Sequence, residues 1–465
     1  MTPSRFAFAA LLMASAAVVE VRPAASQTLQ EAMALAYANN PSLQAARAQL
    51  RAVDENVPQA LAGWRPTVQM TGSIGTVNSQ TTNTNTRNRS SNDRDPLTGA
   101  ASVTQPIYRG GRTTASTSRA ENQVLAQRAR LFATEQQVMQ DVVNAYVAVI
   151  RDSEEVRLNT NNEQVLTRQL QATNERFRVG EITRTDVAQA ESRLAGARAS
   201  RADSEGRLQI ARATFTRLVG QAPQRLTPPQ PLRTPTSTAR EAGLLAAQNN
   251  PNVVASLFDE AASRDQINVQ FANLLPQVSV TAQTFRNDNS QQQDIRQTGN
   301  QVTANLTVPL FQGGAEHSAV RQARQQAQQA RMVVEDQRRS ATQVATQAFE
   351  TLVANRAAVE SVRAQIRAAE IALDGVQREA VVGSRTTLDV LNAEQELLNA
   401  RVSLVRALAN VIISSHTLAA AVGRLTARDL NLPVQIYDME AYYREVRNRW
   451  VGWGDYAETA AERGR

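Results

Sequence analysis

Two turns of nearly the same sequence carry the residues with the clearest chemical roles in this chain. They read "VGEITRTDVAQAESRLAGA" and "VGSRTTLDVLNAEQELLNA", and equivalent residues are 203 positions apart. Each turn has a threonine three residues before an aspartate, Thr183 before Asp186 and Thr386 before Asp389. At this spacing the hydroxyl can accept a hydrogen bond from an early helix amide while the carboxylate reaches back. The pattern predicts two helix starts with capping boxes.

A glycine precedes each predicted cap. Gly180 and Gly383 stand where a left-handed residue can end a helix. A helix that ends at glycine and a helix that begins at threonine together form a helical hairpin. Two hairpins that need the same reversal therefore explain most of the repeated motif.

Enzymatic chemistry is not indicated by the sequence. The chain has two histidines, His317 and His416, and no cysteine. Neither histidine lies in a metal-ligand spacing such as His-Glu-x-x-His, and the sequence contains no glycine-rich phosphate-binding loop. We expect no enzymatic activity, no bound metal and no cofactor.

The charge pattern argues against nucleic acid as a partner. The formal net charge is +7, and all 50 basic residues are arginine. These arginines are interleaved with Glu, Asp and Gln along helical segments, whereas a nucleic-acid site needs them clustered. The pattern is typical of solvated helix faces.

Residues 1–26 have the features of a cleaved secretory signal peptide. Arg5 precedes the apolar run Phe6–Val19, and small residues stand before Gln27. Without cysteine, the exported chain can hold neither a disulfide nor a lipid on an N-terminal cysteine. Since no later stretch reaches the ~18 apolar residues of a membrane helix, we expect any membrane contact to be made by strands.

The mature chain is predicted to be a tandem duplication of one structural unit. The motif "NNPSLQAA" recurs as "NNPNVVAS", and "QPIYRGG" recurs as "VPLFQGG", in the same order. The first repeat is expected to cover residues 27–220 and the second 239–423. A Pro-rich linker, 221–238, joins them, and a C-terminal segment, 424–465, follows.

Each repeat is expected to contain one very long helix and two shorter ones. The long helices are predicted at 112–179 and 314–382, each about 100 Å at the helical rise. Shorter helices are expected at 28–62, with a possible kink, and at 184–219, with equivalents in the second repeat. The combined length of two short helices equals that of one long helix. The short helices are therefore expected to lie end to end beside the long one. Seven-residue spacing favours coiled-coil packing of the long helices, interrupted in the first repeat by the charged residues Arg128 and Glu135.

Strand candidates lie between the first short helix and the long helix of each repeat. Apolar residues alternate with polar ones over about 10 to 13 positions, the pattern of membrane-barrel strands. Polar segments such as Asn78–Asp95 are expected to be exposed loops. Four strands are too few to close a membrane barrel, so the chain is expected to form oligomers. Three chains would supply 12 strands, and two chains would supply the eight strands of the smallest membrane barrels. The alternative without a membrane is two ordinary β-hairpins at the end of a soluble coiled coil.

The duplication, the paired "QPIYRGG" and "VPLFQGG" motifs and the second turn together resemble the TolC-like outer-membrane channels of drug efflux and type I secretion. The resemblance implies an α+β membrane protein, in which a long antiparallel α-helical barrel continues into an outer-membrane β-barrel. It implies a homotrimer with four strands per protomer in the lipid of the cell outer membrane, with a periplasmic tunnel. The implied partners are a periplasmic adaptor (a membrane fusion protein) and an inner-membrane pump of ABC or RND type.

The resemblance also assigns roles at the turns. Asp389 falls where carboxylates form the pore constriction, and Asn392 where some relatives have a second aspartate. Arg385 matches a basic residue that fastens the closed tip to a neighbouring hairpin, with Thr185 and Asp186 as acceptors. Alanine stands where a further tyrosine of this fastening is expected, three residues before the second glycine.

The sequence leaves one rival function and one segment open. A periplasmic coiled-coil adaptor also has long helical hairpins, although adaptors usually have one hairpin between compact β-domains. The C-terminal segment is rich in aromatic residues and has no counterpart in the repeat. We expect it to pack around the middle of the rod or, from about Trp453, to form a disordered tail. The cargo, drug or protein, is not encoded in any motif.

Overall fold

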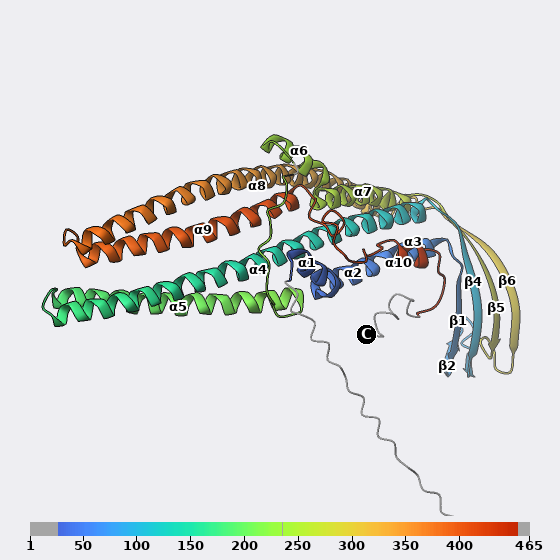
Figure 1. The fold of residues 1–465 in the computed structure, drawn as a ribbon. Coiled ribbons are helices and arrows are strands. Elements are labelled where there is room, and N and C mark those ends of the chain that lie inside the picture. The colour runs from blue at the N-terminus through green and yellow to red at the C-terminus, as the bar shows by residue number, and fades with distance from the viewer. Residues whose placement is uncertain (1–26, 235, 454–465) are drawn as a thin grey trace, which may run out of the picture.

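The protein is an elongated rod of helices that ends in a curved sheet (Figure 1). The structure, a computed structural model, describes residues 27–234 and 236–453. The signal-peptide prediction and most of the predicted tail lie outside these residues. Both repeats run from short helices through strands to a long helix and a return helix, and the first repeat has one additional short helix and two additional strands. All strands lie at one end of the rod, and both predicted turns lie at the other.

The long helices are α4, Arg112–Arg178, and α8, Ala315–Val381, each of 67 residues. Each follows a glycine pair in the left-handed region, where side chains are disfavoured. The return helices are α5, Arg184–Val219, and α9, Thr387–Ala421. α5 packs along α4, and α9 along α8, as the sequence predicts. α9 also lies against α4, which joins the two hairpins.

The first short helix of each repeat is broken rather than merely kinked. In the first repeat it forms α1 (Leu29–Asn39), α2 (Pro41–Asp54), α3 (Asn56–Leu61) and the 3-10 turn η1 (Ala62–Trp64). In the second repeat it forms α6 (Ala239–Asn249), α7 (Pro251–Phe271) and η2 (Ala272–Leu274).

The break occurs at the same Asn-Pro pair in both repeats. The Oδ1 of Asn40 accepts from the Ser42 amide at 2.9 Å, and Asn250 caps α7 in the same way. The Nδ2 of Asn40 donates to the carbonyl oxygen of Leu218 at 3.1 Å, near the end of α5, and Asn250 donates to Ala421 near the end of α9. Each asparagine therefore ties the start of one short helix to the end of the other.

The linker between the repeats also lies at this level of the rod. The Gln27 amide donates to the carbonyl of Arg225, in the linker, at 2.8 Å. The buried Tyr146 hydroxyl of α4 lies within hydrogen-bond distance of the carbonyls of Gln27 and Thr227. The long helix thus holds the linker and the beginning of the first repeat together.

Four strands form one antiparallel sheet in the order β1-β4-β5-β6. Their bounds are β1 Thr67–Ile74, β4 Leu97–Arg109, β5 Gln277–Asp288 and β6 Arg296–Thr307. The prediction that 78–95 is an exposed loop is wrong in part, because β2 (Val77–Thr82) and β3 (Arg89–Arg94) form a separate hairpin there. Both faces of this hairpin are polar, so its sequence lacks the alternation that marks a strand.

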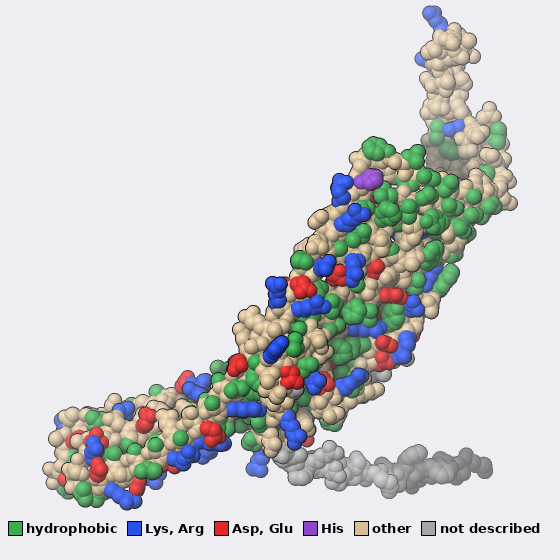
Figure 2. All heavy atoms as spheres, turned by 90° about the horizontal axis from the view of Figure 1, so that it is seen from above, with side chains coloured by type: hydrophobic (Ala, Val, Ile, Leu, Met, Phe, Trp, Pro, Cys, Tyr) green, Lys and Arg blue, Asp and Glu red, His purple; other side chains and the backbone are tan. Residues whose placement is uncertain are grey.

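The strand register collects the apolar side chains on one face. Val68 lies opposite Val103, Val103 opposite Ala282, and Ala282 opposite Val302. Because neighbouring residues of a strand point to opposite faces, the other face carries mainly Thr, Ser, Gln and Asn. Figure 2 shows hydrophobic side chains gathered toward the strand end, with charges of both signs along the helices.

The C-terminal segment does not stay at the middle of the rod. We call residues 424–453 the C-terminal strap. It begins at the middle, where the Ala427 amide donates to Glu135 Oε1 of α4 at 2.7 Å, and continues through α10 (Ala441–Val446) toward the sheet (Figure 1). Burial raises the pKa of Glu135, and the amide hydrogen bond opposes this rise.

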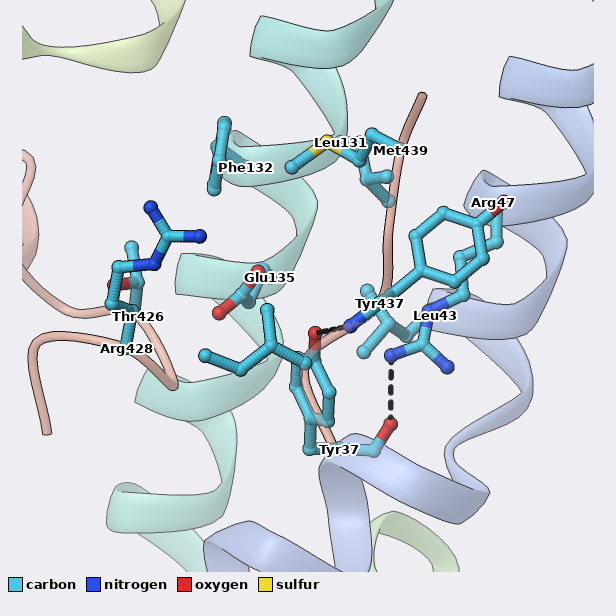
Figure 3. Close-up of a pocket in the computed structure, with 11 residues that line it drawn as sticks. Tyr37, Leu43, Arg47, Leu131, Phe132, Glu135, Thr426, Arg428, Tyr437 and Met439 are labelled. Carbon is cyan, nitrogen blue, oxygen red and sulfur yellow. Dashed lines mark hydrogen bonds between the residues drawn. The ribbon is translucent and has the colours of Figure 1, made fainter. Parts of the chain in front are cut away.

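An aromatic and cationic contact holds the strap beside α1 and α2 (Figure 3). The guanidinium of Arg47 lies over the rings of both Tyr37 and Tyr437, at 4.6 and 5.0 Å. The Tyr437 amide donates to the Tyr37 hydroxyl at 3.1 Å. The two charged interruptions of the first heptad pattern, Arg128 and Glu135, both bind this strap, since Arg128 pairs with Glu440.

α9 corrects one sequence expectation. It contains an 18-residue window with a mean hydropathy of 1.4, so a later segment does reach the composition of a membrane helix. Length and composition alone do not make α9 a membrane span, because α9 lies in the rod beside α8 and α4. Only 28% of the window is buried within the single chain.

We predict that Asn40→Ala lowers the free energy of unfolding by about 1–2 kcal/mol, because it removes a cap and leaves the Leu218 carbonyl without its donor. Thermal unfolding followed by circular dichroism would measure this. Asn39→Ala, at the exposed neighbouring position, is the matched control. Equal stability of the two variants would contradict the role of Asn40.

Candidate functional site at the ends of the hairpins

The two turns have the same backbone geometry. After α4, the amides of Gly180 and Glu181 donate to the carbonyls of Phe177 and Arg176, the paired hydrogen bonds of a Schellman motif. After α8, Gly383 and Ser384 repeat these hydrogen bonds. The φ angles of the two glycines are +79° and +82°, a region in which a side chain would be strained.

Both predicted capping boxes are present. The Asp186 amide donates to Thr183 Oγ1 at 3.3 Å, and the Thr183 amide donates to Asp186 Oδ2 at 3.0 Å. Thr386 and Asp389 have the same two distances. The amide and the hydroxyl of Thr386 donate hydrogen bonds to the Asp389 carboxylate. These hydrogen bonds, with the nearby Arg385 charge, hold the pKa of Asp389 below its usual range. Asp389 is therefore an ionised carboxylate at the end of the second hairpin.

The ion pairs of the two turns have opposite orders along the chain. In the first turn Arg176 donates to Glu181 at 2.7 Å, with the base before the glycine. In the second turn Arg385 donates to Glu379 at 2.8 Å, with the acid before the glycine. The pairing with Glu379 raises the pKa of Arg385. Glu379 is not part of the repeated motif, although comparing the repeats at the 203-residue offset places it opposite Arg176.

The single chain brings only some of the predicted site residues together. Arg385 has Glu379 as its partner, and Asp186 has Thr183 as its partner. Thr185 is exposed next to Asp186. The contact of Arg385 with Thr185 and Asp186 is expected between neighbouring hairpins, and it stays a prediction.

Asn392 joins the two hairpins of the chain. Its Oδ1 accepts from Arg193 of α5 at 2.7 Å. The adjacent Leu391 is only 2% exposed and packs with Leu166 and Leu194 of the first hairpin. A polar contact and an apolar contact thus lie one residue apart on α9. Sequence reasoning could not pair residues 199 positions apart.

A buried carboxylate joins the hairpins nearer the middle of the rod. Glu155 of α4 is 2% exposed. Its Oε1 accepts from Arg406 Nε of α9 at 2.7 Å, and its Oε2 accepts from Arg406 at 3.1 Å and from Arg207 of α5 at 3.0 Å. Burial alone would raise the pKa of Glu155, but the hydrogen bonds and charge of Arg406, with Arg207, outweigh it and lower the pKa.

The described residues contain no cluster of His, Asp and Glu that could hold a metal ion. The polar groups at the turns cap helices and join hairpins. The chain thus combines a sheet with one apolar face at one end and a long helical rod with charged turns at the other. These features define the class of outer-membrane channel proteins.

The chain belongs to the outer membrane efflux protein family. The family described as "Outer membrane efflux protein" matches residues 32–221 and 244–424, one segment for each repeat. The chain is 34% identical to outer membrane efflux protein BepC of Brucella suis over 96% of both chains. It is 25% identical to outer membrane protein TolC of Vibrio cholerae, covering 87% of this chain and 92% of that protein.

Solved structures share the fold. The outer membrane protein VceC of Vibrio cholerae superposes with a TM-score of 0.72 at 21% identity, over 85% of this chain and 96% of that chain. The family assignment confirms the resemblance found in the sequence and decides against the periplasmic adaptor. The protein is a non-enzymatic conduit of the outer membrane, with its helices in the periplasm.

We predict that Arg406→Gln lowers the free energy of unfolding at neutral pH by about 1–3 kcal/mol, the range for a hydrogen bond to a charged group, reduced where the donor is half exposed. The pH dependence should change as well. In the wild type the lowered pKa of Glu155 gives stability that is present above the unfolded pKa, about 4.3, and lost as pH falls below it.

Without Arg406, burial dominates at Glu155, so its pKa rises and stability should begin to fall at a higher pH on acidification. Melting temperatures between neutral and acidic pH would measure this. Arg401→Gln removes the exposed pair with Glu370 and is the control, with little expected change. Identical pH profiles for both variants would contradict the role of Glu155.

Proposed function

We propose that this protein is the trimeric exit duct of a tripartite export machine. In this proposal three chains share one 12-stranded barrel in the outer membrane and one helical tunnel in the periplasm. A periplasmic adaptor and an inner-membrane pump, of ABC or RND type, dock at the turns and open them. The cargo, drug or protein, is left open.

The unpaired sheet edges carry the proposal. Among the described residues, β1 pairs only with β4 and β6 only with β5. Open edges leave backbone amides and carbonyls without partners, and hydrocarbon cannot satisfy them. Pairing β6 of one chain with β1 of the next removes both edges. The incompletely buried apolar window of α9 also supports a neighbouring chain at the helical level.

The chain divides, in this proposal, as the sequence predicts. Residues 1–26 are the signal peptide, 27–220 and 239–423 the two repeats, 221–238 the linker and 424–465 the C-terminal segment. Each repeat supplies one hairpin, so a trimer places six hairpin ends around one opening.

The second hairpin is proposed to line the constriction. Three copies of Asp389 would form a ring of ionised carboxylates that favours cations. Asn392 adds no charge to this ring, and its contact with Arg193 would keep the second hairpin beside the first in the closed state. Opening would then require this contact to break.

Arg385 is the proposed link between neighbouring chains. Its partner within the chain, Glu379, lies in an exposed ion pair, and such pairs are held weakly. The guanidinium can therefore leave Glu379 and bind Thr185 and Asp186 of the next chain at a small cost in free energy.

Oligomeric state tests the proposal directly. Protein extracted from the outer membrane should have the mass of three chains by native mass spectrometry and should form ion-conducting pores in planar bilayers. A two-chain assembly would contradict the trimer. A soluble monomer without conductance would contradict the channel.

We predict that Arg385→Ala and Asp186→Ala each increase single-channel conductance, because each removes one side of the link that keeps the tunnel end narrow. Planar-bilayer recording would measure the change. Arg378→Ala is the matched control, since Arg378 is an exposed arginine near the same turn that pairs with Asp374. If neither variant differs from this control, the link is wrongly assigned.

A further inference from the structure

We propose that the C-terminal strap ends in a lipid anchor. Trp450, Val451 and Trp453 would insert into the headgroup region of the periplasmic leaflet of the outer membrane, beside the start of β1. The bound partner is the phospholipid bilayer itself. This inference rests on the proposed insertion of the sheet in lipid, and it assigns a second, separate membrane contact outside the strands.

A series of contacts fixes the path of the strap. The Tyr442 hydroxyl donates to Glu55 Oε1 at 2.8 Å, just before α3. Arg447 donates to Glu121 Oε1 at 2.9 Å, near the strand end of α4. Tyr37 lies in α1, whereas Glu55 lies just before α3 and Glu121 within ten residues of the start of α4, both nearer the sheet in the chain. The strap is thus held along the rod until it reaches the junction of helix and strand.

Arg65 holds the last part of the strap. Its guanidinium donates to the carbonyl oxygen of Arg449 at 2.7 Å and lies over the Trp450 ring at 5.1 Å. Arg65 stands two residues before β1 and three before Val68, the first outward apolar residue, which is 76% exposed. Three residues of strand span roughly 10 Å. Trp450 therefore lies close to the edge of the apolar band.

The side chains at this end are unusually exposed for their type. Trp450, Val451 and Trp453 are 65%, 85% and 100% exposed. Neighbouring apolar residues that together form an exposed patch mark an interaction site, whereas single ones need no explanation. The strap is held firmly by its polar contacts, yet its apolar end is left uncovered.

The composition at this level fits a lipid interface. All three tryptophans of the chain, Trp64, Trp450 and Trp453, lie at the helix–strand junction or at the strap end beside it. Tryptophan is enriched where a membrane protein crosses from hydrocarbon to water, and girdles of aromatic residues border the apolar band of membrane barrels. Arg65 adds a cation that suits a lipid phosphate.

The same level carries exposed apolar residues at the opposite edge of the sheet. Leu310 and Phe311 follow β6, at the end where β1 begins. The strap would therefore extend an apolar border that the sheet already provides. This continuity favours lipid over a second protein as the occupant.

Tryptophan fluorescence can test the anchor, because the chain has only three tryptophans. The full chain would be placed in nanodiscs of phosphatidylethanolamine and phosphatidylglycerol that contain brominated phospholipid, which quenches nearby tryptophan. The W64F/W453F variant retains Trp450 alone. In the background W64F/W450F/W453F, Met70→Trp reports on the lipid face of β1, and Ile371→Trp reports on the exposed far end of α8.

We predict that Trp450 is quenched by lipid brominated close to the headgroup and shielded from aqueous iodide. Met70→Trp should be quenched by brominated lipid, and Ile371→Trp by iodide alone. If Met70→Trp is quenched by lipid but Trp450 only by iodide, the anchor is refuted and the channel stands. If Trp450 is shielded from both quenchers, protein covers it, for example a neighbouring copy, and the anchor is also refuted. If brominated lipid does not quench Met70→Trp, the sheet is not inserted, and both proposals fail.

Discussion

The backbone hydrogen bonds at the edges of the sheet are the constraint on which the architecture depends. A sheet of four strands has two edges, and lipid offers no partner for either. The polar face and the apolar face, separated by the register of β1, β4, β5 and β6, give the sheet an inner and an outer side. In the proposed trimer, pairing with other copies satisfies this constraint, and a hollow stalk would follow from that closure.

The stalk is held together by different interactions along its length. Near the middle, asparagine caps, the linker and the strap bind α4 through buried polar contacts. Toward the turns, burial decreases and single contacts such as Arg193 with Asn392 join the hairpins. Regions with few buried contacts open at a low free energy. The end that is proposed to widen is therefore the end that is least tightly packed within the chain.

Local features were predictable from the sequence, and distant pairings were not. The capping boxes and glycine turns depend on residues within six positions, so their spacing alone identified them. The sheet face followed from alternation, whereas the β2–β3 hairpin has no alternation to detect. Glu155 with Arg406 and the path of the strap join residues hundreds of positions apart. Of these distant contacts, only the binding of the strap was indicated by the sequence. The charged residues Arg128 and Glu135 interrupt an apolar seam, and a charge in such a seam needs a partner.

The two repeats differ most at the outer end of the sheet. The first repeat extends into the β2–β3 hairpin, while residues 289–295 close the second with a short turn. In a threefold assembly the surface that faces the exterior would display three identical polar projections, although the periplasmic end has six similar hairpins. An antibody or bacteriophage protein that recognised one projection would meet three equivalent epitopes, and a multivalent binder could gain avidity from them without any tighter single contact.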